Sequence, residues 1–98
     1  MNHAITVTTP LGFDDAVQAT RERLAEEGFG VLTEIDMAAT LKAKIGAEIP
    51  PQVILGACRP PLALAALQAD ASIGVFLPCN VVVRVDDDGR TVVQAMDP

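Results

Sequence analysis

The chain alternates between two hydrophobic periodicities, and the changes of period fall at glycine, proline or aspartate residues. Segment 3–8 has apolar side chains at every second position, which is the period of a half-buried β-strand. From Phe13 onward, apolar residues follow a helical stripe until a glycine ends it, with Val17 and Leu24 expected to face a sheet. Segment 29–35 returns to the strand pattern and predicts a second strand.

The middle of the chain predicts two further helices separated by an apolar strand. Asp36 predicts the N-cap of a short helix ending at Gly46, because aspartate satisfies free N-terminal amides and glycine favours a helix C-terminus. After a stiff Pro-Pro loop, segment 53–58 is apolar enough to lie in the interior of a sheet. Pro60 and Pro61 then open an alanine- and leucine-rich helix, since proline fits the first helical turn.

The C-terminal third predicts a connector followed by a β-hairpin. Residues 70–76 form the connector, and the β-branched runs 81–85 and 90–96 flank an acidic loop containing Gly89. The hairpin must be antiparallel, and the half-polar strands suit a sheet with one solvated face. The expected fold class is therefore α+β, in a single domain of residues 1–98. It consists of a five-stranded, largely antiparallel sheet with helices mainly on one face, in the order β-α-β-α-β-α-β-β.

Composition indicates an acidic folded protein and argues against several partners. The 98 residues are 50% hydrophobic, which is more apolar than a disordered chain. The formal net charge is −6 and neither Trp nor Tyr occurs, so we expect no nucleic acid and no membrane as partner. Segment 1–10 lacks signal-peptide features, which favours a cytoplasmic location. So small and apolar a domain is expected to form a homodimer that buries a sheet face or edge.

Several short motifs follow one another along nearly the whole chain. They are Gly28-Phe29 before Val31 and Ile35-Asp36, Gly56-Ala57-Cys58-Arg59-Pro60-Pro61, Leu77-Pro78-Cys79-Asn80-Val81-Val82-Val83, Gly89 and Met96-Asp97-Pro98. In this order they resemble the domain of unknown function 302 family. The resemblance implies a compact bacterial or archaeal α/β domain that tends to dimerise and has no established activity. It also implies that Asn often stands where this chain has Cys58, so the two cysteines set the chain apart.

The two cysteines are the leading candidates for chemistry. Cys58 ends a predicted strand just before a helix N-terminus and stands beside Arg59, and both the helix dipole and the cation favour a thiolate. Cys79 opens the strand after that helix, so antiparallel pairing of the two strands would place both thiols at one end of the sheet. Asn80 would supply a hydrogen bond to a ligand held there.

Three interpretations of the cysteine pair remain open from the sequence. The thiols form a reversible dithiol couple, or they bind a soft metal or haem, or they are two small core residues. We predict an uncharacterised dimeric binding or sensor module with a site for a small molecule or metal near Cys58, Arg59, Cys79 and Asn80. The alternative is a thiol-redox protein that uses the two cysteines. The cofactor and any enzymatic activity stay unassigned.

Other residue patterns argue against familiar activities. The chain has no nucleotide-binding glycine motif and no serine-hydrolase motif, and its one histidine is His3. A structural zinc site needs four ligands, which two cysteines and His3 cannot supply within one chain, although a dimer would double the thiols. Asp86, Asp87 and Asp88 are consecutive, unlike the alternating ligands of an EF-hand loop, and are interpreted as a solvated hairpin tip.

Overall fold

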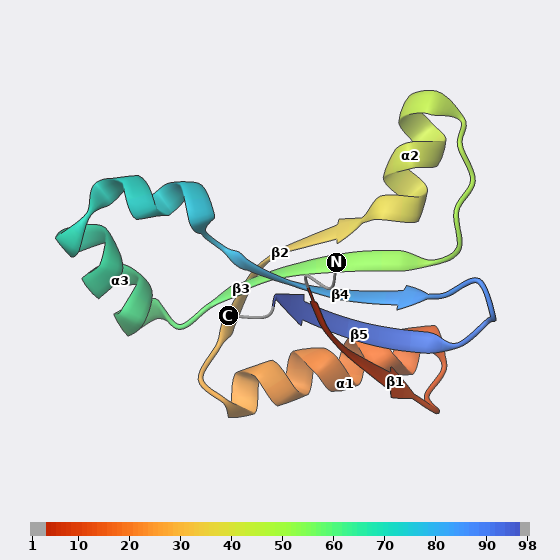
Figure 1. The fold of residues 1–98 in the computed structure, drawn as a ribbon, viewed down its shortest axis with the longest axis horizontal. Helices are drawn as coiled ribbons and strands as arrows, with labels where there is room; N and C mark the ends of the chain where they lie inside the picture. The colour runs from red at the N-terminus through yellow and green to blue at the C-terminus, as the bar shows by residue number, and fades with distance from the viewer. Residues whose placement is uncertain (1–3, 97–98) are drawn as a thin grey trace.

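The computed structural model describes residues 4–96, and its elements follow the predicted order (Figure 1). They are β1 (Ala4–Thr9), α1 (Phe13–Glu26), β2 (Gly30–Asp36), α2 (Met37–Ile45), β3 (Gln52–Cys58), α3 (Pro60–Ala69), the 3₁₀ helix η1 (Ala71–Phe76), β4 (Cys79–Val85) and β5 (Thr91–Met96). The 3₁₀ helix η1 occupies the segment predicted as a connector. His3, the predicted first residue of the first strand, lies outside the described residues.

The five strands form one sheet in the order β1-β5-β4-β3-β2. All four neighbouring strand pairs are antiparallel, which confirms the predicted α+β class. The first strand pairs with the last, so the two ends of the described chain meet in the sheet. On the opposite edge, the register between β2 and β3 shifts between Val31 and Thr33, an irregularity of the β-bulge kind.

Local side-chain chemistry sets the element boundaries where the sequence predicted them. The carboxylate of Asp36 accepts a hydrogen bond of 2.9 Å from the amide of Ala39 and so caps α2. Gly46 ends that helix in the left-handed conformation, with φ of 67°. Gly89 adopts φ of 81° in the loop between β4 and β5, where a residue with a Cβ would be strained.

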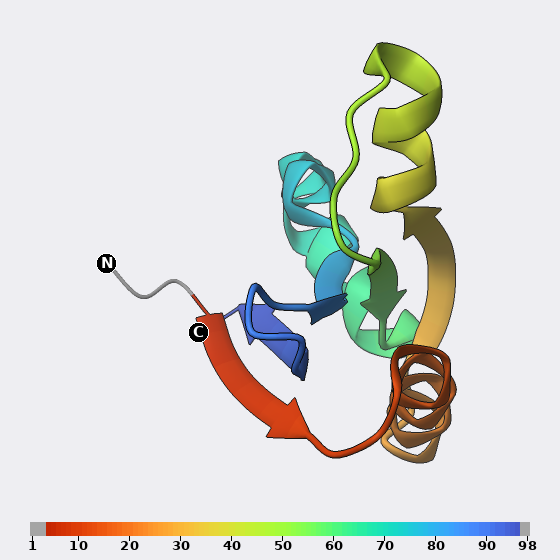
Figure 2. The ribbon, with the colours of Figure 1, turned by 90° about the vertical axis from the view of Figure 1, so that its right-hand side faces the viewer.

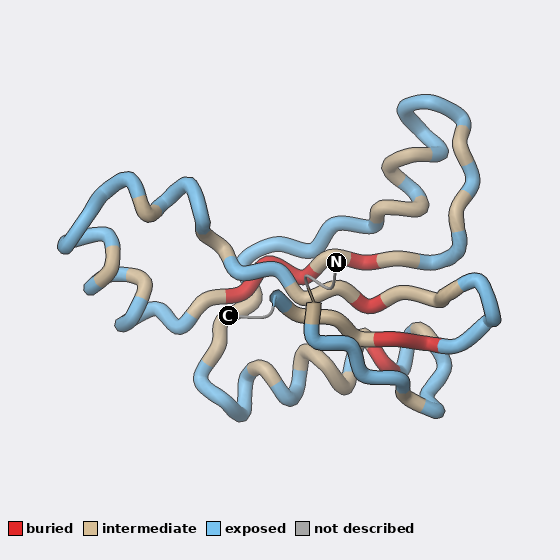
Figure 3. The backbone as a smooth tube through the Cα atoms, viewed as in Figure 1, coloured by how far each residue is buried: buried red, intermediate tan, exposed pale blue. Residues whose placement is uncertain are grey.

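Most of the core lies between α1 and the middle strands of the sheet (Figure 3). Leu55 pairs with Val81, and Val53 pairs with Val83, so these four side chains point to the same face. Leu55 and Val83 are fully buried, and Ala16 is the buried residue of α1. The main core is therefore built on β3 and β4, with α1 as its cover.

The other two helices extend from opposite ends of the sheet (Figure 1). We refer to α3 and η1 together, residues 60–76, as the α3–η1 arm, because α3 packs chiefly against η1. Large apolar side chains of the arm are exposed: Leu62, Leu64, Leu67, Val75 and Phe76. No helix within residues 4–96 is both long and apolar enough to span a bilayer. The arm is thus an apolar surface that lies outside the core.

We predict that Leu55→Ala lowers the free energy of unfolding by about 2–5 kcal/mol, as truncation of a fully buried leucine does. Glu26→Ala on the exposed side of α1 is the control and should change it by less than about 0.5 kcal/mol. Leu24→Ala should fall between them, because Leu24 faces the sheet but is only half-buried. Urea unfolding of the three variants measures this. Equal midpoints for Leu55→Ala and Glu26→Ala would contradict the described core.

Candidate functional site

Both cysteines line one cavity, where the end of the sheet meets the α3–η1 arm. The cavity has a volume of about 250 Å³, and we call it the cysteine cavity. Its lining residues are Phe29, Cys58, Arg59, Leu62, Ala63, Ala66, Leu77 and Cys79. Most of these side chains are apolar, and two thiols and one guanidinium supply the polar chemistry.

The strand register places both cysteines at the same end of the sheet. Ala57 of β3 pairs with Cys79 of β4, so Cys58 and Cys79 are one register position apart. The prediction that both thiols lie at one end of the sheet is confirmed. Both are free thiols, with Cys58 half-buried and Cys79 exposed. Neither cysteine is fully buried within one chain. Because consecutive strand residues point to opposite faces, the register directs the Cys58 and Cys79 side chains to opposite faces of the sheet at this end.

Glycine at position 56 shapes the strand crossing beside the cavity. A Cβ on Gly56 would lie 2.7 Å from Cγ of Pro78 and would also collide with Oγ1 of Thr33. The missing side chain lets the ring of Pro78 lie against β3. The Leu77-Pro78 peptide bond is cis. Because Leu77 and Cys79 flank this proline and both line the cavity, Gly56 contributes to the shape of the site.

Arg59 lies over the aromatic ring of Phe29. Its guanidinium carbon is 4.7 Å from the ring centroid, within the range of a cation–π contact. Among residues 4–96, no carboxylate lies within ion-pairing distance of Arg59. The cation therefore has charge available for an anionic ligand group. Phe29 was not among the predicted site residues, although it belongs to one of the short motifs.

Asn80 is not among the residues that line the cavity. It pairs with Gly56, and consecutive strand residues point to opposite faces, so its side chain leaves β4 on the face opposite to that of Cys79. Within residues 4–96, no cluster of three or more His, Cys, Asp or Glu side chains is arranged to hold a metal ion. One chain thus offers a soft metal two thiols at this cavity.

The acidic residues of the β4–β5 loop serve the hairpin itself. The carboxylate of Asp86 accepts hydrogen bonds from the amides of Asp88, at 3.0 Å, and Arg90, at 2.9 Å. The bond from the Arg90 amide is the main reason why the pKa of Asp86 is lowered from its ordinary value. Arg90 also pairs with Asp88 at 2.7 Å. This exposed hairpin tip agrees with the interpretation of the three aspartates as a turn.

Comparison with known proteins links the whole described fold to one family. The family described as "Domain of unknown function DUF302" matches residues 5–98. The crystal structure of an uncharacterized conserved DUF302 protein from Bacillus stearothermophilus is 32% identical in sequence and superposes with a TM-score of 0.89. The superposition covers 98% of this chain and 74% of that chain. No curated protein matches the chain.

We predict that Gly56→Ala lowers the free energy of unfolding by about 1–3 kcal/mol, because the new methyl group overlaps Pro78 and Thr33. Gly30→Ala is the matched control in the neighbouring strand, since the nearest atom to its new Cβ is a backbone oxygen at 3.9 Å. Urea unfolding should show a loss for Gly56→Ala alone. If both variants match the parent protein, the close approach of Pro78 to β3 is incorrect.

Proposed function

This chain belongs to the DUF302 family, and from that premise we propose that it is a homodimeric binding or sensor module whose ligand site is the cysteine cavity. The observation that supports this most is the convergence of Cys58, Cys79 and Arg59 on one cavity with apolar walls. Ligand sites typically combine apolar walls with a few convergent polar groups. The ligand that fits has an apolar or aromatic body and an anionic group, which Arg59 would bind.

The location of the cavity supports a sensing role. Its walls come both from the sheet, through Cys58 and Cys79, and from α3, through Leu62 and Ala66. A helix of ten residues is marginal in isolation, and α3 packs chiefly against the short η1. A ligand that contacts both walls would therefore fix the arm against the sheet. Ligand binding in the cysteine cavity would then increase the order of the α3–η1 arm.

For the homodimer we propose the α3–η1 arm as the interface, in place of the sheet face or edge expected from the sequence. The exposed leucines of α3 and the exposed Val75 and Phe76 of η1 need a partner that removes them from water. Asp70 is the one charged residue of segment 60–76. Two chains that each carry a net charge of −6 repel one another least through a surface with so little charge. A second copy of this chain is therefore the partner that we assign to the arm.

The probe that tests the ligand site is 1-anilinonaphthalene-8-sulfonate, which has an aromatic body and one anionic group. We expect it to bind and to slow alkylation of Cys58 and Cys79 by iodoacetamide. Ala63→Leu should weaken binding about tenfold or more, because the added side chain fills the cavity. Ala65→Leu is the control on the same helix, since Ala65 is exposed and does not line the cavity. Equal probe affinity in both variants, or thiols that the probe does not protect, would contradict the proposed site.

For the homodimer, we expect light scattering to give a mass near twice the chain mass of 10.3 kDa at micromolar concentration. Leu64→Glu should shift this mass toward that of one chain, because it places a charge on the exposed apolar surface of α3. Ile45→Glu is the control, since Ile45 is an exposed apolar residue of α2. A mass of one chain for the parent protein would contradict the homodimer. A mass of two chains that Leu64→Glu leaves unchanged would contradict this interface.

A second candidate function is thiol redox exchange, because both thiols are free and both cysteines line one cavity. The exchange requires the two side chains, which the strand register directs to opposite faces, to turn toward one another. With glutathione disulfide as oxidant, the Cys58 thiolate would attack one sulfur and release one glutathione. The Cys79 thiolate would then attack the mixed disulfide and release the second glutathione, each leaving thiolate taking up one of the two cysteine protons. Intact-mass spectrometry distinguishes the functions. Loss of both thiol hydrogens favours redox exchange, whereas unchanged thiols favour the binding module.

A further inference from the structure

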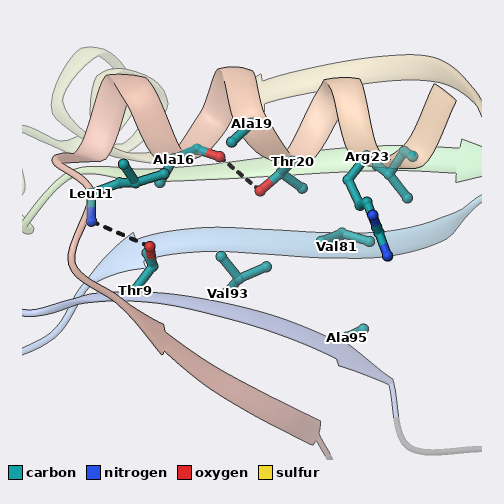
Figure 4. A pocket seen from close by; sticks show the side chains of 10 residues that line it. Thr9, Leu11, Ala16, Ala19, Thr20, Arg23, Val81, Val93 and Ala95 are labelled. Atoms are coloured by element: carbon teal, nitrogen blue, oxygen red, sulfur yellow. Dashed lines mark hydrogen bonds between the residues drawn. The ribbon is translucent and has the colours of Figure 1, made fainter. Parts of the chain in front are cut away.

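A second and larger cavity lies between α1 and the strands β4 and β5 (Figure 4). It has a volume of about 360 Å³, within the range of about 300–1,000 Å³ that small-molecule sites occupy. We call it the α1 groove. Its lining residues are Thr9, Leu11, Ala16, Ala19, Thr20, Arg23, Leu24, Val81, Val93 and Ala95. It shares none of these with the cysteine cavity.

Small side chains on both sides create the α1 groove. Ala16 and Ala19 of α1 and Ala95 of β5 carry single methyl groups where larger residues would fill the space. The two hydroxyl groups are satisfied within the protein. Thr20 donates to the carbonyl of Ala16 at 2.7 Å, and Thr9 accepts from the amide of Leu11 at 3.2 Å. Apart from Arg23, the remaining wall is aliphatic, so the body of a ligand would also have to be aliphatic.

The apolar surface of the groove continues onto the edge strand β1. Ile5 pairs with Ala95, and Val7 pairs with Val93, so both side chains share the face that lines the groove. Ile5 is 52% exposed and Val7 is 58% exposed. Figure 2 shows that β1 is nearest to α1 at its C-terminal end, where loop 10–12 joins the two, and lies farther from α1 toward its start. A chain-like ligand could therefore extend from the groove along β1 without leaving apolar surface.

One charged residue lines the α1 groove, and it is a cation. Figure 4 shows Arg23 reaching from α1 toward the sheet at the end of the groove opposite Leu11. Its ion pairs with Glu26, at 3.5 Å, and Glu27, at 3.8 Å, are long, and its side chain is 76% exposed. Exposed pairs of this kind contribute little stability. The guanidinium can therefore exchange them for a ligand carboxylate in bidentate geometry.

We propose that the α1 groove binds an aliphatic carboxylate, with its hydrocarbon chain against Ala19 and Val93 and its carboxylate on Arg23. The aliphatic walls set the body of the ligand, and the one cation at the rim sets its head group. A single negative charge fits better than a phosphate, because Glu26 and Glu27 flank Arg23 and the chain is acidic. This site is independent of the function proposed for the cysteine cavity.

Decanoate is the probe, and decanol is the matched ligand without the charge. In methyl-detected NMR, decanoate should shift the resonances of Leu24, Val81 and Val93. Each methylene removed from the acid should weaken binding by up to about fourfold. Arg23→Gln should weaken decanoate about three- to tenfold and leave decanol unchanged. Arg21→Gln is the control, because Arg21 pairs with Glu34 and does not line the groove.

Ala19→Leu should abolish binding of both probes, because the larger side chain fills the groove. Circular dichroism checks that this variant folds. If it does not fold, the resonance shifts that decanoate causes in the parent protein test whether the groove binds it. Shifts confined to residues outside the groove, or equal losses of decanoate and decanol in Arg23→Gln, would overturn the proposal. The proposal would also be overturned if decanoate caused no shift and Ala19→Leu converted a dimer to single chains. The groove would then be a protein interface.

Discussion

One helix packed on a five-stranded sheet is the constraint on which the rest of this structure depends. An α-helix is about 10 Å across with its side chains, and neighbouring strands are about 4.8 Å apart, so one helix covers two or three strands. Here α1 lies over the region where Leu55 and Val83 are fully buried. The same face on β1 keeps Ile5 and Val7 in contact with water. The α1 groove is the space where this cover ends.

The same constraint accounts for the α3–η1 arm. With α1 occupying the covered face, α3 leaves the end of β3 and packs chiefly against η1 (Figure 1). Its leucines face solvent, although a helix that is apolar around its circumference is normally buried. The cysteine cavity forms at the root of the arm, between its apolar side chains and the ends of two strands. Uncovered apolar surface and the candidate ligand site thus have one origin in the fold.

Local signals predicted most of the fold. The cap of Asp36 and the left-handed Gly46 depend on neighbouring residues alone, so the sequence located α2 closely. The placement of Cys58 and Cys79 at one end of the sheet followed from one topological assumption, antiparallel pairing of the flanking strands. The contribution of Phe29 to the cavity was not predicted, because it depends on how β2 aligns with β3. The α1 groove was also missed, since alanines facing a sheet do not reveal in sequence whether the space beside them is filled.

The central claim, that α1 covers only the middle of the sheet, is tested most directly by the exposure of individual methyl groups to a soluble gadolinium chelate in NMR. The account predicts strong relaxation enhancement at Ile5 and Val7 and very little at Leu55 and Val83. Enhancement at Ile5 and Val7 as weak as that at Leu55 and Val83 would contradict it, because β1 would then be covered like the centre of the sheet.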